Sequence, residues 1–176
     1  MIYVFLADGC EEIEALTPID VLRRAKKDVK VVGVGKKTIV SSHNIRITCD
    51  AETTEVSPNE DIEAVILPGA LNLEKSEKVN EFIDRASSDG KLICAICAAP
   101  SVLGHKNLLR GKTATCFPGF EKDLYGAVAT GATVERDGNI ITARGMGVAL
   151  EFGLKTVEAL CGSEVAESIK TSVQSE

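Results

Sequence analysis

The chain of 176 residues contains no tryptophan and only two histidines, His43 and His105. A structural zinc site needs four ligands, usually drawn from closely spaced pairs of cysteine and histidine. Neither histidine stands within a second ligand pair of the usual spacing. We therefore expect no metal, and we also expect no bound cofactor.

Long apolar runs are also missing. The first run, MIYVFLADG, has no basic region before it and is broken at Asp8, far short of a signal peptide or a membrane-spanning helix. We therefore expect a cytoplasmic protein with no membrane partner. Six cysteines are present, and in a reducing compartment cysteines are usually free thiols that pack as small apolar residues.

Positive charge is outweighed by negative charge, which gives a formal net charge of −6. Nucleic-acid binding depends on clustered Lys and Arg, so we expect no nucleic-acid partner. The chain has no internal repeat and no low-complexity linker, and 44% of its residues are hydrophobic. This length and composition predict a single domain over residues 1–176 with one sizeable core.

Short apolar runs alternate with segments of helical periodicity. Strands are predicted at 2–7, 29–35, 62–70, 91–96 and 113–116, hairpins at 38–50 and 133–143, and helices at 11–26, 74–88, 147–160, 163–173 and from about 99. Buried strands that alternate with helices indicate a mostly parallel sheet covered on both faces. Ligands bind such sheets at the carboxyl ends of the strands, here residues 8–14, 68–70 and 97–99.

Cys94 and Cys97 have the C-x-x-C spacing of a redox pair or half a zinc site. On an extended strand they lie roughly 10 Å apart, whereas a disulfide needs Cα atoms within about 7 Å. Cys94 is therefore predicted to be a core residue. Cys97 lies where the strand ends and a helix begins, and backbone N–H groups there would lower the pKa of its thiol. From the residues alone, a functional Cys97 and a merely packed one remain open.

Five segments in this order resemble the successive motifs of the ThiJ/PfpI superfamily: LADGCEEIEALTPIDVLRRA, AVILPGA, ICAICAAPSVLG, TCFPGFEKDL and ARGMGVALEFGLKTVEAL. They are most similar to the branch that contains the Parkinsonism-associated protein deglycase and its bacterial relatives. The resemblance covers nearly the whole chain. It implies an α/β fold, a flavodoxin-like three-layer α/β/α sandwich of the class I glutamine amidotransferase type, and a homodimer with a reactive cysteine.

Carried over by position, the resemblance implies that Cys97 is the nucleophile and Glu14 its acidic partner. The backbone donors for a developing oxyanion would be the amides of Gly69 or Ala70 and of Ala98. A protonated Glu14 can donate a hydrogen bond to a thiolate and can move protons for a substrate hydroxyl. An ionised Glu14 would instead repel the thiolate.

The chain departs from the peptidases of this superfamily. They carry a histidine directly after the nucleophile, where this chain has Ala98, and some relatives have one at the position of Phe117. His105 is about 12 Å from Cys97 along a helix and cannot easily serve as its base. The remaining Cys-Glu pair suits proton transfer on a small α-oxoaldehyde such as methylglyoxal, with Cys116 and Phe117 expected to line the pocket.

Three functions follow from the resemblance. The first is a cysteine-dependent enzyme of the glyoxalase III or deglycase type, acting on small aldehydes or on glycated protein. In it Cys97 adds to the aldehyde, Glu14 moves a proton between carbons, and water releases a hydroxy acid. The second is a redox sensor or chaperone in which Cys97 is oxidised without turnover. The third is a cysteine peptidase, which would need a histidine from a neighbouring subunit.

Overall fold

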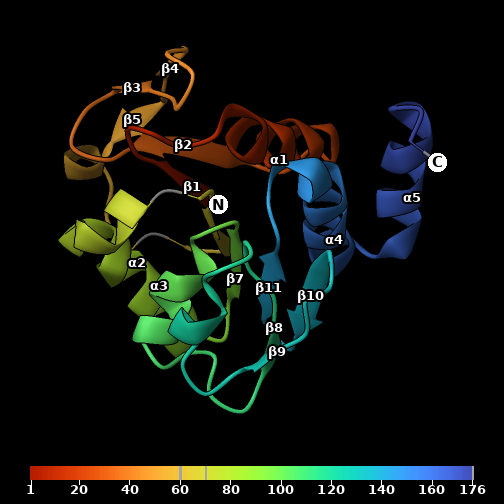
Figure 1. Cartoon of the computed structure of the whole chain (residues 1–176). Helices are drawn as coiled ribbons and strands as arrows, with labels where there is room; N and C mark the ends of the chain where they lie inside the picture. Colours follow the sequence, from red (N-terminus) through yellow and green to blue (C-terminus); the bar gives the residue numbers. More distant parts are fainter. Residues whose placement is uncertain (60, 70, 176) are drawn as a thin grey trace.

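The computed structural model describes residues 1–59, 61–69 and 71–175, with a seven-stranded sheet at its centre (Figure 1). In sheet order the strands are β10 (Val134–Asp137), β11 (Ile140–Ala143), β7 (Leu92–Ile96), β6 (Ala64–Leu67), β1 (Ile2–Leu6), β2 (Val29–Gly33) and β5 (Ala51–Glu52). Two small sheets pair β3 (Thr38–Val40) with β4 (Arg46–Thr48) and β8 (Thr113–Ala114) with β9 (Val128–Ala129).

The central strands run parallel in the order β2-β1-β6-β7-β11, which is the flavodoxin-like order 2-1-3-4-5. β5 extends the sheet in parallel beside β2, and β10 closes the opposite edge antiparallel to β11. The prediction of a mostly parallel, flavodoxin-like sheet is confirmed. In this order the chain changes direction between β1 and β6, so the carboxyl ends of these strands frame the expected ligand crevice.

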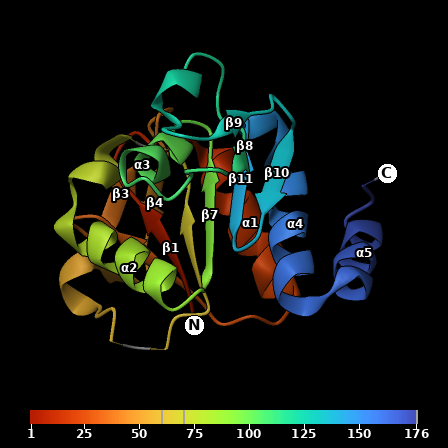
Figure 2. The ribbon, with the colours of Figure 1, turned by 90° about the horizontal axis from the view of Figure 1, so that it is seen from below.

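Helices cover both faces of the sheet. They are α1 (Glu12–Arg24), α2 (Glu77–Ser88), α3 (Pro100–His105), α4 (Ala149–Cys161) and α5 (Ser163–Ser172), with the short 3-10 helices η1 (Thr53–Glu55), η2 (Leu71–Lys75), η3 (Glu121–Asp123) and η4 (Met146–Val148). Figure 2 shows α2 and α3 on one side of the sheet and α1 and α4 on the other, with α5 outside α4. This is the predicted three-layer sandwich.

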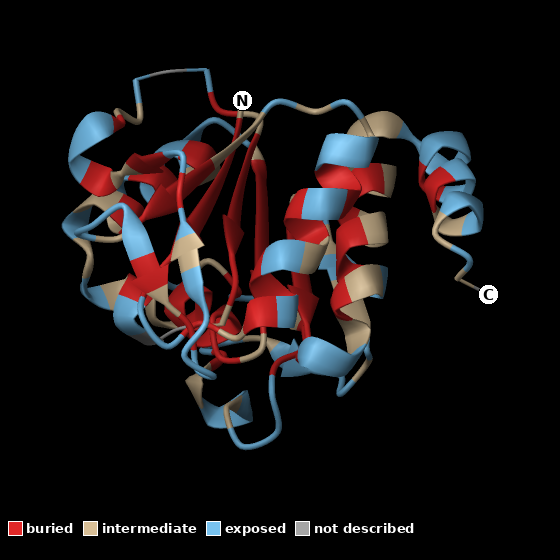
Figure 3. Ribbon diagram, turned by 90° about the horizontal axis from the view of Figure 1, so that it is seen from above, coloured by how far each residue is buried: buried red, intermediate tan, exposed pale blue. Residues whose placement is uncertain are grey.

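The core lies between the layers. Every residue of β1, β6 and β7 is buried, and Figure 3 shows buried residues along the central strands and on the inner faces of α1 and α4. α1 and α4 approach closely at Gly153, where an added Cβ would lie 3.3 Å from the Cα of Pro18 and from the Cβ of Val21. This contact fixes α1, the helix that carries Glu14, against the rest of the fold.

The helix α1 begins at Glu12, one residue later than the predicted start at 11. Glu11 is the N-cap residue, and its side chain accepts a hydrogen bond from the amide of Glu14 at 2.8 Å. Asp8 instead accepts a hydrogen bond from the amide of Val40 and pairs with Lys36. Asp8 thereby attaches the β1–α1 turn to the β3–β4 hairpin and does not cap α1.

Other boundaries differ for local reasons. The predicted helix over 74–88 begins at Glu77, because the Ser76 side chain accepts from the amide of Val79 and caps it there. The predicted strand at 113–116 is only two residues long and pairs with β9 outside the central sheet. Both predicted hairpins are present. Within the described residues, no helix is long and apolar enough to cross a membrane.

Candidate functional site

Cys97 follows β7 in a backbone conformation that is rare for a residue with a side chain. Its φ is +66°. The surroundings hold this conformation, since the amide of Cys97 donates to the carbonyl of Ala143 at 2.9 Å and the amide of Phe117 donates to the carbonyl of Cys97 at 2.8 Å. A strained residue held in this way at a strand end is typical of functional sites. The sulfur is half-buried at the carboxyl end of the sheet.

Gly69 follows β6 and lies at the point where Cys97 and Glu14 meet. A Cβ built on Gly69 would be 2.6 Å from the Cβ of Cys97 and 2.7 Å from Oε2 of Glu14. These separations are shorter than any ordinary van der Waals contact, so only glycine fits here. Three segments far apart in the sequence therefore converge, as predicted from the ends of their strands.

The Glu14 carboxyl group is buried in the first turns of α1, with only 2% of the residue exposed. Burial raises its pKa from 4.5 to about 7, although the Cys97 thiol and the amides of Gly69 and Met146 act in the opposite direction. Its Oε2 atom has no hydrogen-bond partner among the residues that the structure describes. An unpartnered buried carboxyl oxygen is costly, and here it lies beside a thiol.

The pKa of Cys97 is raised to about 12, first by burial and then by the charge of Glu14, while the amide of Ala98 lowers it. The predicted lowering by a backbone amide at the helix start is present, but the net direction of the shift is the opposite of the predicted one. α3 is only six residues long, and burial together with a neighbouring carboxylate outweighs the backbone donors. Both shifts favour a protonated thiol beside a carboxyl group whose pKa lies close to neutral pH.

The other residues predicted to form the site are Ala98, Ala70, Cys116 and Phe117. Ala98 is buried with its amide toward the sulfur, whereas Ala70 lies outside the described residues. Cys116 is buried, and burial raises its pKa to about 11. Phe117 is 48% exposed. Cys94 is fully buried and accepts from the Thr156 hydroxyl at 3.6 Å, which agrees with the predicted core role.

The sequence analysis missed the turn after β11. A Cβ on Gly145 would lie 3.3 Å from the ring of Phe117 and 3.5 Å from Oε1 of Glu14, so this glycine lies between the two side chains. The amide of the next residue, Met146, lowers the pKa of the Glu14 carboxyl group. The signal that could have found them is the glycine-rich run RGMG directly after a buried strand.

Both histidines bond to carboxylates elsewhere. Nδ1 of His105 is 2.7 Å from Oε1 of Glu74, and Nδ1 of His43 is 2.9 Å from Oε2 of Glu12. Within the described part of the chain, neither histidine is hydrogen-bonded to Cys97. The chain itself therefore forms no Cys-His pair of the kind that a cysteine peptidase uses.

One group among the described residues could hold a metal ion, because ligand atoms of Glu11, Glu12 and His43 all lie within 4.8 Å of one another. The oxygens of Glu12 already accept from the Ser41 hydroxyl and from the backbone amide of His43. These bonds and His43 hold the pKa of Glu12 well below its usual range. The group connects α1 to the β3–β4 hairpin.

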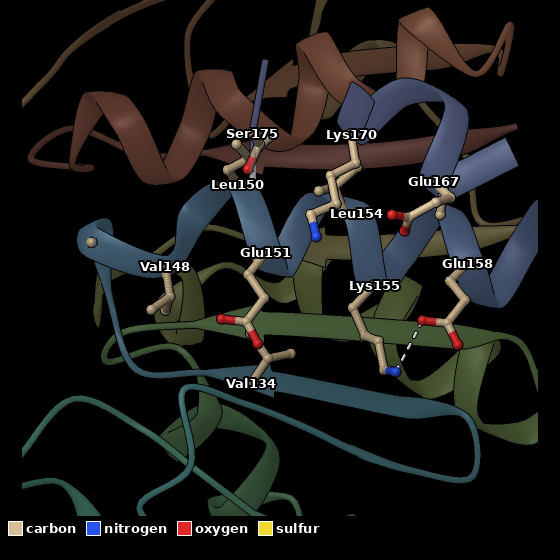
Figure 4. A pocket seen from close by; sticks show the side chains of 12 residues that line it. Val134, Val148, Leu150, Glu151, Leu154, Lys155, Glu158, Glu167, Lys170 and Ser175 are labelled. Carbon is tan, nitrogen blue, oxygen red and sulfur yellow. Dashed lines mark hydrogen bonds and ion pairs between the residues drawn. The ribbon is translucent and has the colours of Figure 1, made fainter. Parts of the chain in front are cut away.

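A cavity of about 630 Å³ lies elsewhere, between α4, α5 and β10 (Figure 4). Its lining mixes apolar residues with charged ones, among them the pair Lys155–Glu158 at 2.9 Å. None of Cys97, Glu14 and Gly69 lines it. Volume alone therefore does not locate the reactive group, and the thiol with its buried carboxyl partner is the stronger candidate.

Curated relatives match over most of the chain. The Parkinson disease protein 7 homolog of Danio rerio is 37% identical over 175 residues, which cover 95% of this chain and 93% of the relative. A protein of Pyrococcus abyssi that is named a deglycase is 30% identical over 148 residues, which cover 81% of this chain and 89% of the relative.

Solved structures agree in fold. The crystal structure of Drosophila melanogaster DJ-1beta has a TM-score of 0.92 and 36% identity, and the match covers 99% of this chain and 97% of that one. Toxoplasma gondii DJ-1, described as oxidized, has a TM-score of 0.93 and 30% identity, with the same coverage. The model of the DJ-1/PfpI family matches residues 1–159. The chain therefore belongs to the DJ-1/PfpI family.

Proposed function

We propose that the protein is a cofactor-independent enzyme that converts small α-oxoaldehydes such as methylglyoxal, or their adducts on proteins, through Cys97 and Glu14. One observation carries this proposal: a buried Glu14 with a pKa of about 7 has an unpartnered oxygen beside the Cys97 thiol. A group that is half protonated near neutral pH serves both as general base and as general acid. The relative named a deglycase supports the same chemistry.

The first step forms the carbon–sulfur bond. As the sulfur of Cys97 attacks the aldehyde carbon, the thiol proton passes to the Glu14 carboxylate. This transfer is required because the thiol is protonated at neutral pH, with its pKa raised to about 12. Glu14 then gives this proton to the aldehyde oxygen, so the product is a hemithioacetal and Glu14 is again a carboxylate. The amides of Gly69 or Ala70 and of Ala98 are the proposed donors to the oxygen as it becomes negative.

The second step is an internal oxidation and reduction of the substrate. Glu14 removes the hydrogen on the former aldehyde carbon as a proton and returns it to the neighbouring ketone carbon, while the hydroxyl proton of the hemithioacetal passes to the ketone oxygen. The aldehyde carbon is thereby oxidised to a thioester and the ketone is reduced to an alcohol. Water then breaks the thioester, releasing a 2-hydroxy acid and the free thiol. The reaction consumes only water, so its electrons balance without a cofactor.

The neighbourhood of the site supports small substrates. We propose that Cys116 and Phe117 line the pocket, since the amide of Phe117 is bonded to the backbone of Cys97. We further propose that residues 1–176 act as one domain in the cytoplasm and that the protein is a homodimer. Three exposed aliphatic side chains favour a partner surface on α1 and the β3–β4 hairpin: Ile13, Leu16 and Ile45.

The test is lactate production from methylglyoxal by the purified protein and by Cys97→Ala and Glu14→Gln. We expect both variants to lose most of the activity. Cys161→Ala is the matched control, because Cys161 is a half-buried thiol at the far end of α4. Equal lactate from the wild type and the Cys97 variant would contradict the proposal.

Oxidation of Cys97 without turnover is a second candidate. The unpartnered Oε2 of Glu14 favours it, because a protonated carboxyl group at this position could donate to a sulfinic acid oxygen on Cys97. Peroxide treatment followed by mass spectrometry of the Cys97 peptide tests it. A stable sulfinic acid in the wild type, but not in Glu14→Gln, is the expected result.

A further inference from the structure

Two large apolar side chains that follow the reactive pair in the fold are exposed, Phe117 at 48% and Met146 at 51%. Single exposed apolar residues are common on protein surfaces and need no explanation. These two differ because their backbones contact the reactive pair. The amide of Phe117 donates to the carbonyl of Cys97 at 2.8 Å, and the amide of Met146 lowers the pKa of the Glu14 carboxyl group.

The contacts at Gly145 place the ring of Phe117 beside the carboxyl group of Glu14. The position of a Cβ on Gly145 is 3.3 Å from the ring of Phe117 and 3.5 Å from Oε1 of Glu14. The ring and the carboxyl oxygen therefore flank the same methyl-sized space. Met146 follows Gly145 directly and begins the short helix η4, so its side chain belongs to the same turn.

A second hydrogen bond also fixes the backbone of Phe117. Its carbonyl accepts from the amide of Phe120 at 3.1 Å, which closes a turn directly after the bond to Cys97. The nearby carboxylate of Glu121 accepts from the amide of Gly119 at 2.8 Å within the same loop. The backbone of Phe117 is thus fixed beside the site, and the adjacent carboxylate of Glu121 is bonded within its own loop.

We propose that Phe117 and Met146 form an apolar rim that gives the site a preference for α-oxoaldehydes with an apolar substituent, such as phenylglyoxal, over glyoxal. This inference rests on the proposed function and specifies its substrate class. A substituent that extends from the ketone carbon past Glu14 would cover the exposed ring and thioether and remove apolar surface from water. An apolar contact of this size typically changes kcat/KM by about tenfold or more.

The experiment compares kcat/KM for phenylglyoxal, methylglyoxal and glyoxal. We expect the wild type to prefer phenylglyoxal over glyoxal by about tenfold. Phe117→Ala and Met146→Ala should each reduce that ratio, because they raise KM for phenylglyoxal more than KM for glyoxal. Phe117→Leu should restore part of the preference. Val165→Ala is the control, because Val165 is a partly exposed apolar residue on α5.

A binding measurement separates this inference from the proposed function. Mandelate and glycolate are the hydroxy acids that phenylglyoxal and glyoxal would give, and their dissociation constants can be measured by calorimetry without turnover. Tighter mandelate binding that is lost in Phe117→Ala would support the rim even if no aldehyde is turned over. Turnover with equal kcat/KM for all three aldehydes, or equal binding of the two acids, would overturn the rim.

Discussion

The backbone of Gly69 packs against the side chain of Cys97, because a Cβ on Gly69 would lie only 2.6 Å from the Cβ of Cys97. The same Cβ would be 2.7 Å from Oε2 of Glu14. The glycine therefore sets the distance between the thiol and the carboxyl group. Cys97 cannot move easily, since its backbone is bonded to the carbonyl of Ala143 and to the amide of Phe117.

We predict that Gly69→Ala lowers lactate production on the order of 100-fold, because a displacement of about 1 Å at a reacting group has effects of that size. Gly147→Ala is the matched control, since a Cβ there meets no atom within 4 Å. Circular dichroism should show that both variants are folded. A Gly69→Ala protein with wild-type kcat/KM would show that the close contact does not position the pair.

The buried Glu14 should make the protein less stable as pH rises from about 4.5 to about 7. Burial raises the pKa of Glu14 to about 7 from an ordinary value of 4.5, so in this interval the folded chain binds more protons than the unfolded chain. The free energy of unfolding therefore falls with rising pH, by an amount on the order of 3 kcal/mol at full effect.

Urea unfolding of the wild type and of Glu14→Gln tests this at about pH 4, 6 and 8. The neutral glutamine cannot titrate, so other groups contribute equally to both proteins. We expect the wild type to lose stability relative to the variant as the pH rises. A difference between the two proteins that is constant across this range would contradict a raised Glu14 pKa.

The parallel sheet could be predicted from the sequence, because a parallel sheet covered on both faces needs continuous apolar strands, and β1, β6 and β7 are of this kind. The flavodoxin-like order of these strands was implied by the resemblance to a known family. Their carboxyl ends then had to lie together, which placed Glu14, Gly69 and Cys97 in one region. The resemblance to a known family assigned Glu14 as the partner, since its spacing alone allowed an ordinary helix-start acid.

Two features could not be predicted. Gly145 reaches the site from β11, which pairs with β7 through register Ile140 to Ile93. The run RGMG marks the turn after this strand but does not reveal its contact with Glu14. The pKa of Cys97 depends on the balance between burial, a carboxylate and one amide, and this balance exists only in three dimensions. The position of Cys97 at the start of a helix suggests a lowered pKa instead.

Replacement of Cys94 should separate packing from chemistry within the C-x-x-C sequence. Cys94 is fully buried in β7, and burial raises its pKa to about 12. We expect Cys94→Ala to lower the free energy of unfolding by about 1 kcal/mol through the small cavity it leaves, with no change in kcat/KM. Cys97→Ala should lower kcat/KM and leave the free energy of unfolding close to that of the wild type. Loss of activity in Cys94→Ala without loss of stability would revive a dithiol role.

The bond between His105 and Glu74 joins two segments that continue from the site, since α3 follows Cys97 and η2 follows Gly69. Nδ1 of His105 is 2.7 Å from Oε1 of Glu74. We predict that His105→Ala lowers the free energy of unfolding by about 1 kcal/mol, the usual net contribution of a partly buried hydrogen bond.

A double-mutant cycle with Glu74→Ala measures this bond, and the two losses should be non-additive because each change removes the same interaction. Lys106→Ala is the control on the same helix end, where Lys106 pairs at 2.8 Å with the more exposed Asp84 of α2. Exposed ion pairs contribute little, so this change should cost less than about 0.5 kcal/mol. Additive losses for His105 and Glu74 would mean that the bond does not stabilise the link between α3 and η2.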